Sequence, residues 1–600
     1  MKLSHYIFQT LKDHGYDTVF LVTGGGAMHL NDSIGRIEGM KYICNHHEQA
    51  SAMAAEGYAR VAGKPAILNV TTGPGGINAL NGVFGAFTDS IPMIVIGGQV
   101  KRETMLSKYN IEGLRQLGDQ EVEIIPMVKG ITKYAVTVID PNTIKYHLEK
   151  AMYLAVNGRP GPVWLEIPVD VQGSQIELDA MEGFTPSKEE KLDNSNLQRD
   201  VALVIEKIKH AERPIFIGST GVKLAKAGDA LIETLAKTGL PVVSAWGHDF
   251  IHHDHPNYIG KQGSIGDRPG NFAVQNSDCV VIIGSRMPIR QVSYNWENFA
   301  RVAYKIQVDI DKVEMTKPTI KIDLPLCYDA KDFLEEMNKQ LTAISFDASK
   351  YKTWLDWCVA RKNSFSIVLP HHKNPERPIN SYHFIHELHK KLTGNDVIVC
   401  GNATACIVTF QTSEVKKGQH LFSNSGSASM GYDLPAAIGA AAADPKKRII
   451  CMAGDGSIQM NVQELQTIVL HQMNIKIFVL DNEGYLSIKQ TQKNFFGLSL
   501  GSSPDSGVTC PDMAKVAAAY GIPSFTIKDF NFDKQLNEVL AMEGPVLINV
   551  ILDTEQGFEP KLSSKQLPDG KMVSAPLEDM FPFLPEEELK KNMLIPIMKF

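Results

Sequence analysis

Residues 448–482, RIICMAGDGSIQMNVQELQTIVLHQMNIKIFVLDN, contain two short apolar runs on either side of a helix-like segment. The first run, Arg448–Ala453, predicts a buried strand, and the second, Ile475–Leu480, predicts another. Two strands joined by a helix pair in parallel, because the connecting helix packs back onto the sheet. This stretch therefore predicts a parallel sheet of the α/β class.

The helix between the two strands has a candidate start signal. Asn461 is followed three positions later by Glu464, which is the spacing of a capping box with a reciprocal glutamate. We therefore expect a helix that begins at Asn461 and runs to about His471.

Each of these strands ends on a residue that offers oxygen ligands. The first ends on Gly454-Asp455-Gly456, and the second ends on Asp481-Asn482. Carboxyl ends of parallel strands share one sheet edge, so Asp455 and Asn482 should converge there. Carboxylate and amide oxygens suit Mg²⁺, which also takes phosphate oxygens, and the glycines let a diphosphate approach the backbone. The alternative is an ordinary acidic turn with a solvated Asn482.

The whole sequence has the properties of a large soluble protein. Its 600 residues imply several domains, and 44% hydrophobic with 21% charged residues is typical of globular chains. The net charge of −7 argues against a nucleic-acid partner. No uncharged apolar run reaches about 18 residues, so no membrane span is expected. Met1–Gln9 predicts an amphipathic helix rather than a signal peptide, and the eight scattered cysteines are typical of reduced core thiols in a cytoplasmic protein.

Alternating strands and helices divide the chain into three blocks, at 1–175, 190–340 and 375–555, followed by an arm at 556–600. The fold class that we predict is α/β, with three doubly wound parallel-sheet domains and this C-terminal arm. Ser187–Asn196 is polar and predicts a linker between the first two blocks. The expected strands are Thr18–Val22, Ala66–Val70, Pro92–Ile96, Pro214–Ile217, Pro241–Ser244, Cys279–Ile283, Tyr304–Val308, Asp396–Val399, Arg448–Ala453, Ile475–Leu480 and Pro545–Ile551.

The first block carries a candidate catalytic acid. His47-Glu48-Gln49 precedes a run of small residues, Ala50–Ala62, that predicts a helix. A carboxylate buried at such a site and close to a heterocycle nitrogen would hold or share a proton, because desolvation favours its neutral form. The alternative is a glutamate that complements the helix dipole.

Residues 46–78, HHEQASAMAAEGYARVAGKPAILNVTTGPGGIN, closely resemble the first domain of the acetolactate synthase family. This family lies in the pyruvate-oxidase-like branch of the thiamine diphosphate (ThDP) enzymes. The resemblance covers about residues 1–560 and includes TGGGA at 23–27, GRPGP at 158–162, GSASMGYDLP at 426–435 and the motif of the third block. It implies a pyrimidine-binding first domain, a central domain and a diphosphate-binding third domain. It also implies ThDP, Mg²⁺, and active sites between the subunits of a homodimer or homotetramer.

The resemblance assigns a role to each motif residue. Glu48 matches the glutamate that hydrogen-bonds the aminopyrimidine ring, Met430 the bulky residue under the thiazolium, and Gln120 an active-site glutamine. Asp119 stands beside Gln120 where phenylalanine is usual, and read alone Met430 would be a flexible core residue. The implied metal ligands are Asp455, Asn482 and the Gly484 carbonyl. The other implied cofactor-binding residues are Gly24, Gly25, Gly26, Gly73, Gly401, Asn402, Gly454, Gly456 and Ser457.

Three regions depart from the biosynthetic acetolactate synthases, and one of them is the C-terminal segment Lys561–Leu584, which is longer and more basic at its start. In Leu486–Gln492, Thr491 occupies the place of a tryptophan and Lys489 the place of a methionine, which predicts a wider, more polar acceptor pocket with Lys489 acting in catalysis. The alternative is a solvated lysine. In the central domain, Arg286, Arg290 and Asp309 match FAD-binding positions, whereas Ile289 replaces an aspartate. FAD binding and an empty central domain both stay open.

The expected function is ThDP- and Mg²⁺-dependent decarboxylation of a 2-oxo acid, with pyruvate as the expected donor, followed by carboligation to a second carbonyl compound. The acceptor is a second 2-oxo acid or a keto-sugar, and the C-terminal segment Lys561–Leu584 resembles tails of relatives from sugar pathways. The alternatives are a non-ligating decarboxylase, a C–C hydrolase of cyclic diketones, and a catalytically silent binding subunit. The partners expected are small molecules, with neither nucleic acid nor membrane.

Overall fold

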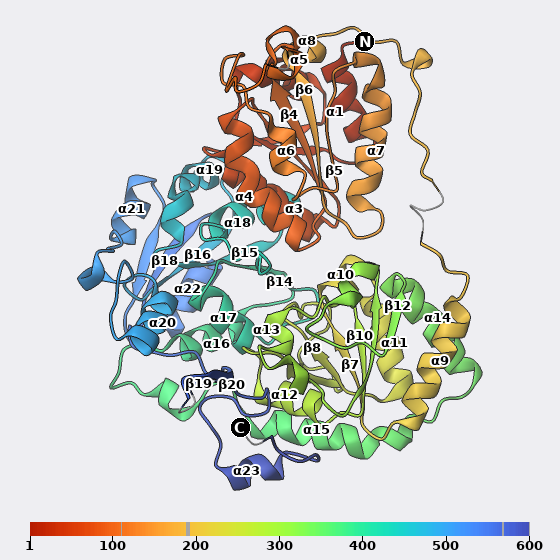
Figure 1. Ribbon diagram of the computed structural model, residues 1–600. Helices are drawn as coiled ribbons and strands as arrows, with labels where there is room; N and C mark the ends of the chain where they lie inside the picture. The colour runs from red at the N-terminus through yellow and green to blue at the C-terminus, as the bar shows by residue number, and fades with distance from the viewer. Residues whose placement is uncertain (110, 188–191, 567–568, 599–600) are drawn as a thin grey trace. The chain divides into compact units, whose positions relative to one another are not determined.

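The computed structural model describes residues 1–109, 111–187, 192–566 and 569–598 (Figure 1). These residues form two compact units. The first unit combines Met1–Lys191, Asn395–Cys406 and Ser423–Leu552, and the second combines Leu192–Gly394, Ile407–Phe422 and Asp553–Phe600. The first block of the sequence and most of the third therefore share one unit. Part of the expected linker, residues 188–191, lies outside the described residues.

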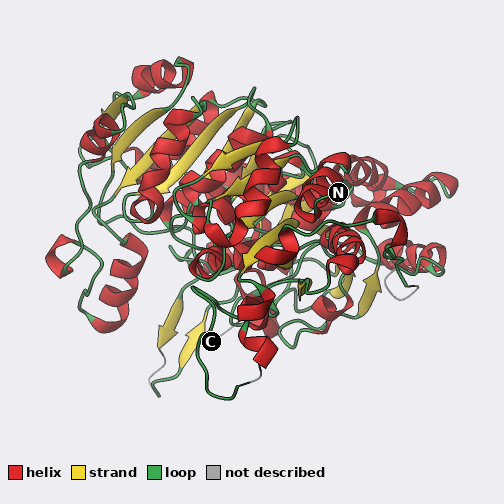
Figure 2. Ribbon diagram, turned by 90° about the horizontal axis from the view of Figure 1, so that it is seen from above, coloured by secondary structure: helices red, strands yellow, loops and turns green. Residues whose placement is uncertain are grey.

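Three six-stranded parallel sheets confirm the predicted fold class. Their strand orders are β2-β1-β3-β4-β6-β5, β12-β11-β10-β7-β8-β9 and β14-β13-β15-β16-β18-β17. Helices lie on both sides of the strands (Figure 2), which is the doubly wound arrangement. Every strand that the sequence predicted is present, although β4 runs on to Gln99.

The first sheet is covered by helices on both faces. Its alternating residues Val19 and Leu21 pack with α1 and α7 in one core. The amphipathic N-terminal helix is confirmed, because α1 buries one apolar side, made of Leu3, Tyr6, Ile7, Phe8 and Leu11. The elements are β1 Thr18–Leu21, β2 Lys41–Cys44, β3 Ala66–Val70, β4 Met93–Gln99, β5 Tyr134–Thr137, β6 Pro162–Pro168, α1 Leu3–Asp13, α2 Met28–Arg36, α3 Glu48–Ala62, α4 Pro74–Thr88, α5 Leu106–Tyr109, α6 Ile124–Val128, α7 Ile144–Val156 and α8 Val169–Gln172.

The second sheet belongs to the second unit. Its strands are β7 Pro214–Gly218, β8 Val242–Ser244, β9 Tyr258–Lys261, β10 Cys279–Ile283, β11 Tyr304–Asp309 and β12 Leu324–Cys327. Its helices are α9 Leu197–His210, α10 Thr220–Leu224, α11 Gly228–Thr238, α12 Arg268–Gln275, α13 Ile289–Val292, α14 Ala330–Ala343 and α15 Lys352–Ser364.

The third sheet contains the stretch that decided the fold. Its strands are β13 Asp396–Cys400, β14 His420–Phe422, β15 Arg448–Gly454, β16 Ile475–Asp481, β17 Ser524–Ile527 and β18 Val546–Ile551. The accompanying helices are α16 Ser381–Lys391, α17 Thr404–Thr412, α18 Asp433–Ala443, α19 Leu465–Leu470, α20 Leu486–Phe496, α21 Met513–Ala519 and α22 Asp533–Ala541. All eight cysteines are free thiols, and those in β10, β13 and β15 are buried.

The predicted capping box between β15 and β16 is wrong. A 3₁₀ turn, Ile458–Glu464, precedes α19, and Asn461 has a non-helical backbone within it. The Asn461 amide donates to Gln49 Oε1 and the Gly431 carbonyl, while Glu464 accepts the Asn45 amide and the His46 N–H. Both side chains thus bind other segments of the first unit, so neither is left to cap a helix.

The C-terminal segment is folded and packed within the second unit. It contains an antiparallel pair, β19 Ser564–Gln566 and β20 Met572–Ser574, and a helix, α23 Glu586–Lys591. Leu577 joins the core that includes β7 and β10 residues. The buried Glu578 carboxylate accepts hydrogen bonds from Gln275 at 2.6 Å and Arg301 at 2.8 Å.

Helices α3 and α18 join the first and third domains within the first unit. A Cβ on Gly439 would lie 1.9 Å from the Ala54 carbonyl oxygen, and one on Gly57 would lie 2.3 Å from the Ala436 carbonyl oxygen. The two backbones therefore touch at both glycines, and side chains at either position would force the helices apart.

A buried ionic network lies at the same junction. Arg60 on α3 contacts Glu56 at 2.6 Å and Asp89 at 2.7 Å. Tyr432 donates to Glu56 and the Gly426 N–H donates to Asp89, so the third domain completes the network. Burial raises the pKa of Glu56, and the Arg60 charge opposes this rise.

Arg60→Met should lower the free energy of unfolding by about 3–5 kcal/mol, because two buried carboxylates lose their cation. The matched control is Arg36→Met, which removes an arginine that is 75% exposed from its pair with Asp32 and should cost less than about 1 kcal/mol. Chemical denaturation of both variants measures the difference. Equal, small losses would show that the network contributes no stability.

Candidate active site

Asp455 and Asn482 converge at the carboxyl edge of the third sheet. Strands β15 and β16 are paired in parallel with Gly454 opposite Leu480, so both residues follow the same edge. Asp455 is 2% exposed, and its two oxygens accept the Gly456 N–H at 2.9 Å and the Gly484 N–H at 2.7 Å. Both residues therefore lie at one sheet edge, where the sequence predicted that their side chains would converge.

The electrostatics of this edge fit a divalent cation. Burial and the nearby Asp481 raise the pKa of Asp455 to about 7. The Asn482 amide donates to Thr404 Oγ1 at 3.3 Å, while its Oδ1 is buried without a hydrogen-bond partner among the described residues. Adjacent carboxylates and an unpaired amide oxygen are costly unless a cation is present, and they are the ligand types that Mg²⁺ prefers.

Glycines shape the space beside these ligands. A Cβ on Gly456 would lie 2.3 Å from the Tyr485 ring, and one on Gly484, whose φ is +118°, would lie 2.6 Å from the Ser502 carbonyl oxygen. At Gly454 the nearest atom would be Ser457 Cβ, at 3.8 Å. The backbone at Gly454 is therefore open enough for a phosphate group to approach.

Ser457 connects this motif to the segment that carries Met430. Its hydroxyl donates to Asp433 Oδ2 and accepts the Gly431 N–H, both at 2.9 Å. Burial raises the pKa of Asp433 to about 6. A Cβ on Gly401 would lie 2.6 Å from the same Asp433 oxygen, so the end of β13 packs against this network. Asn402 donates to the Ala428 carbonyl at 3.3 Å.

Glu48 is the first residue of α3 and is buried. Asn78 on α4 donates to Glu48 Oε2 at 3.0 Å. A Cβ on Gly75 would lie 3.4 Å from Oε1, so the glycine leaves that oxygen room. Glu464 fixes the turn before α3 through Asn45 and the His46 N–H, at 2.8 and 2.9 Å.

Polar contacts link the Glu48 region to the Met430 region within the first unit. Gln49 accepts the Asn461 amide, which also binds the carbonyl of Gly431, next to Met430. On α4, Asn81 accepts the Ser429 hydroxyl at 2.6 Å. Sequence reasoning did not assign Asn78, Asn81 or Asp433, and it took Glu464 for a capping residue. The available signals were the quoted motifs, since Asn78 ends GPGGIN and Asp433 lies in GSASMGYDLP.

The glycine loop before α2 packs against the end of β3. A Cβ on Gly24 would lie 2.5 Å from Thr71, and one on Gly26 would lie 2.1 Å from Thr72. The Gly26 N–H donates to Thr71 Oγ1 at 3.1 Å, whereas Gly25 has open space around it. The loop is therefore held at its outer glycines and open at the middle one.

Sequence models of the three domains of thiamine pyrophosphate enzymes match this chain. The N-terminal TPP binding domain matches residues 1–122, the central domain 201–337 and the C-terminal TPP binding domain 401–550. The acetolactate synthase isozyme 2 large subunit of Escherichia coli (strain K12) is 30% identical over 584 residues, covering 97% of this chain and 100% of the relative.

The chain belongs to the thiamine diphosphate enzymes. Its relatives include the chloroplastic acetolactate synthase of Arabidopsis thaliana, 30% identical over 93% of this chain and 82% of the relative. The acetolactate synthase large subunit of Lactococcus lactis subsp. lactis (strain IL1403) is 28% identical over 93% of this chain and 94% of the relative. This ThDP enzyme is therefore of the acetolactate-synthase-like, transferase type.

The glutamine expected in the ThDP site, Gln120, lies in an irregular segment and is exposed. Its φ is +61°, which is rare for a residue with a side chain. Its carbonyl oxygen would be 2.0 Å from a Cβ on Gly73, so the two backbones are in contact. The structure therefore places Gln120 beside the Gly73 loop, which borders Glu48 through Gly75.

Lys489 and Thr491, where a methionine and a tryptophan were expected from the family resemblance, lie on α20. Lys489 is half-buried, and Thr491 is exposed with its hydroxyl bound to the Ser487 carbonyl at 2.9 Å. Ile488, which precedes them, and the residues Phe495, Phe496, Leu498 and Leu500, which follow them, expose large apolar side chains. The segment that follows Asn482 thus presents a mixed polar and apolar surface.

The central domain of this ThDP enzyme has a sheet edge with unpaired polar groups. Arg286 follows β10 and Asp309 ends β11, the neighbouring strand. Beyond the ends of β8 and β9, the Trp246 Nε1 and both Gln262 amide atoms are buried without hydrogen-bond partners among the described residues. The Arg290 guanidinium lies 5.6 Å from the Trp246 ring centroid.

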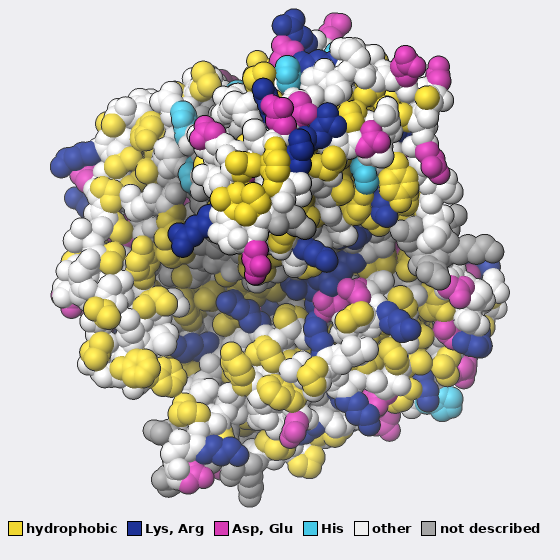
Figure 3. Space-filling model, turned by 45° about the horizontal axis from the view of Figure 1, so that its top comes forward, with side chains coloured by type: hydrophobic (Ala, Val, Ile, Leu, Met, Phe, Trp, Pro, Cys, Tyr) yellow, Lys and Arg dark blue, Asp and Glu magenta, His cyan; other side chains and the backbone are white. Residues whose placement is uncertain are grey.

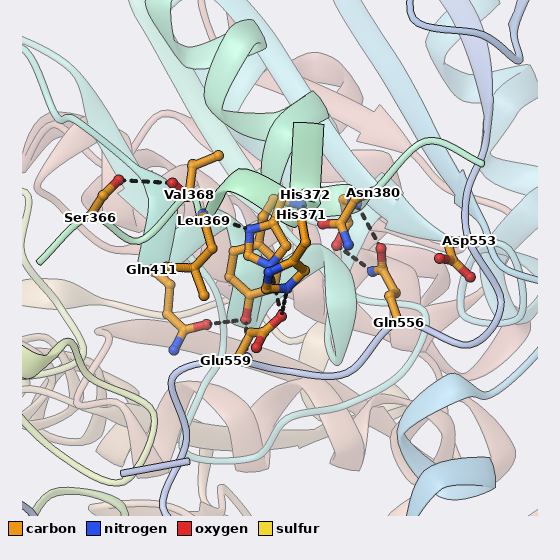
Figure 4. Close-up of polar contacts among 12 residues, drawn as sticks. Ser366, Val368, Leu369, His371, His372, Asn380, Gln411, Asp553, Gln556 and Glu559 are labelled. Carbon is orange, nitrogen blue, oxygen red and sulfur yellow. Dashed lines mark hydrogen bonds and ion pairs between the residues drawn. The ribbon is translucent and has the colours of Figure 1, made fainter. Parts of the chain in front are cut away.

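His371, His372 and Glu559 form a cluster that resembles a metal site (Figure 4). Both Nε2 atoms contact Glu559 Oε1, at 2.6 and 2.8 Å. However, His372 Nδ1 accepts the Leu369 N–H at 3.0 Å, so the ring proton is on Nε2. A metal at Nε2 would need the tautomer with the proton on Nδ1. That Nδ1–H would then face the Leu369 N–H, which is also a donor. The cluster is therefore a hydrogen-bond network that anchors Glu559.

The described residues contain no helix that is both long and apolar enough to cross a membrane. On the face shown in Figure 3, Lys and Arg side chains are mixed with Asp and Glu side chains and with apolar ones. A cytoplasmic location stays a prediction.

Proposed function

We propose that this protein decarboxylates a 2-oxo acid, with pyruvate as donor, and joins the remaining two-carbon unit to a second carbonyl compound. The observation that carries the proposal is that this chain supplies both parts of the expected site: a buried Glu48 at the start of α3, and the sheet edge that carries Asp455 and Asn482. Relatives named acetolactate synthases, similar over nearly the whole chain, support it. An intact Glu48, Asp455 and Asn482 argue against a silent binding subunit.

The chain's own residues have distinct roles in this proposal. Asp455, Asn482 and the Gly484 carbonyl would hold Mg²⁺, and Gly454 would admit the diphosphate. When bound, ThDP supplies a ring that accepts the electron pair released by decarboxylation. Because Asn78 binds Glu48 Oε2, we assign Oε1 as the atom that exchanges a proton with the cofactor's pyrimidine. Met430 would support the thiazolium ring. A homodimer or homotetramer remains the proposed assembly.

Lys489 and Thr491 support an acceptor larger than pyruvate. A threonine fills less space than the large apolar wall of a tryptophan. Lys489 supplies a point charge suited to a phosphate or carboxylate. We therefore propose an anionic acceptor, of which a nucleotide-linked keto-sugar is the leading class.

An acceptor panel tests this specificity. With pyruvate as donor, the wild type should prefer a nucleotide-linked keto-sugar over pyruvate and 2-oxobutyrate. Lys489→Met should reduce that preference about tenfold. This corresponds to about 1.4 kcal/mol, the loss expected when one hydrogen bond to a charged group is removed. Lys493→Met, an exposed lysine on the same helix, should leave the ratio unchanged. Preference for pyruvate or 2-oxobutyrate, with no effect of Lys489→Met, would establish ordinary acetolactate synthesis.

The same panel separates the alternative reactions. Acetaldehyde as the sole product from pyruvate would indicate a non-ligating decarboxylase. Ring opening of cyclic diketones without release of CO₂ would indicate a C–C hydrolase. Either result would replace carboligation as the proposed function.

We also propose that the central domain binds FAD. The support is the row of unpaired polar groups beyond β8 and β9 together with Arg286 and Asp309, because ligands of doubly wound sheets bind at this edge. The protein purified from cells should be yellow and release FAD on denaturation, and Arg286→Ala should release it more readily. Colourless protein that takes up no added FAD would contradict the proposal. Ile289, which stands where an aspartate is expected, does not support FAD binding.

A further inference from the structure

The segment between β4 and α6, residues 100–123, carries Gln120 and has little regular structure. Its only α-helix in the described residues is the short α5. Within this mostly exposed segment, Glu121 is a buried acid, 5% exposed. A buried carboxylate in an irregular loop must be satisfied by its surroundings, or its burial would be costly.

The Glu121 carboxylate accepts three backbone hydrogen bonds from its own segment. Oε1 accepts the Leu106 N–H at 2.6 Å. Oε2 accepts the Gly118 N–H at 2.9 Å and the Leu117 N–H at 3.3 Å. A carboxylate offers hydrogen-bond acceptors on both of its oxygens. Glu121 therefore ties the start of the segment, at α5, to its end.

The turn at residues 118–121 depends on this carboxylate. The Glu121 N–H donates to the Gly118 carbonyl at 3.2 Å, which closes the turn. Gln120 occupies its third position with a φ of +61°. Non-glycine residues keep such a conformation only where the surrounding structure imposes it. Here Glu121 holds Gly118 at both of its backbone groups. The Glu121 carboxylate accepts the Gly118 N–H, and the Glu121 N–H donates to the Gly118 carbonyl.

The turn has a defined neighbour in the candidate site. The Gln120 carbonyl oxygen is in contact with Gly73, at whose position a Cβ would lie 2.0 Å from it. Gly75, two residues further, borders Glu48 Oε1. The conformation of the turn therefore decides where Gln120 stands relative to the loop that flanks Glu48.

We propose that Glu121 is a positioning residue: its carboxylate holds the left-handed turn that presents Gln120 to the active site. The role of Gln120 in the reaction rests on the proposed function, whereas the hold on the turn does not. Glu121 itself is not expected to touch substrate or cofactor, because both its oxygens are occupied by backbone amides.

Glu121→Gln tests this role with little change of shape. The amide keeps one acceptor and places an NH₂ group against at least one backbone N–H, so the turn should loosen. Glu112→Gln, an exposed glutamate of the same segment, is the matched control. Hydrogen exchange of peptides covering 105–121 should become at least about tenfold faster in Glu121→Gln and stay unchanged in Glu112→Gln. Unchanged exchange in both variants would overturn the proposal.

A double-mutant cycle tests the link to Gln120. In the holoenzyme, Glu121→Gln should lower kcat/KM for pyruvate about 10- to 100-fold, with most of the loss in kcat, as expected for a misplaced active-site group. In a Gln120→Ala background the same change should cost less than about twofold, because the positioned group is gone. Equal losses in both backgrounds would show a general structural role and overturn the proposal.

The two proposals fail in different ways. If the wild type with ThDP and Mg²⁺ releases no CO₂ from pyruvate, the proposed function fails, and the exchange comparison alone decides whether Glu121 holds the turn. If the wild type is active and exchange at residues 105–121 is insensitive to Glu121→Gln, the positioning role fails while the function stands.

Discussion

Asp455→Ala is expected to abolish ThDP binding in the presence of Mg²⁺. The variant removes the carboxylate that would complete a cation site. Its neighbours, Asp481 and the unpaired Asn482 oxygen, remain but cannot hold the cation without it. Loss of even an indirect partner of a bound metal typically costs 10–100-fold in affinity, so loss of a direct ligand should cost more than about 100-fold.

Calorimetry with ThDP and Mg²⁺ measures this loss, and thermal unfolding supports it. The wild-type melting temperature should rise when both are added, because they bind only the folded state, and that of Asp455→Ala should not. Asp529→Ala, an exposed aspartate of the third domain, is the control and should behave as the wild type. Unchanged ThDP affinity in Asp455→Ala would show that the metal site lies elsewhere.

Glu48→Gln is expected to keep the fold and the affinity for ThDP while lowering the rate of CO₂ release. Gln keeps the size of the side chain and its contact with Asn78, but it cannot exchange a proton at Oε1. General acid–base groups typically contribute 10²–10⁴-fold, so a loss of that order is expected in kcat.

Stopped-time assays of CO₂ release from pyruvate test this prediction, with ThDP affinity measured in parallel. Glu38→Gln, an exposed glutamate of the same domain, is the control. A rate for Glu48→Gln within about twofold of the wild type would remove Glu48 from the mechanism, since that is far below the contribution of such groups.

The strands that the sequence predicted are all central strands of their sheets. The edge strands, β2, β5, β9, β12, β14 and β17, were not among them, and neither was the interior strand β6. Central strands of parallel sheets are buried on both faces and form continuous apolar runs. Edge strands such as β2, with one buried residue in Lys41–Cys44, lack that pattern, so their place in the sheet depends on pairing that the local sequence does not encode.

The candidate site shows the same division. The convergence of Asp455 and Asn482 was predictable, because it follows from the parallel pairing of two adjacent strands. The partners of these residues were not predictable, since they come from distant segments: Thr404 binds Asn482, and Asn78 binds Glu48. Asn461 and Glu464 had the spacing of a cap, yet contacts with Gln49 and Asn45 took both side chains.

The central claim is that this chain couples decarboxylation to carbon–carbon bond formation. The most direct measurement follows ¹³C-labelled pyruvate by NMR with purified protein, ThDP, Mg²⁺ and the acceptor panel. The account predicts release of CO₂ that requires both cofactors, with the labelled two-carbon unit recovered in a ligated product. Labelled pyruvate left intact under these conditions, or label recovered entirely in acetaldehyde, would contradict it.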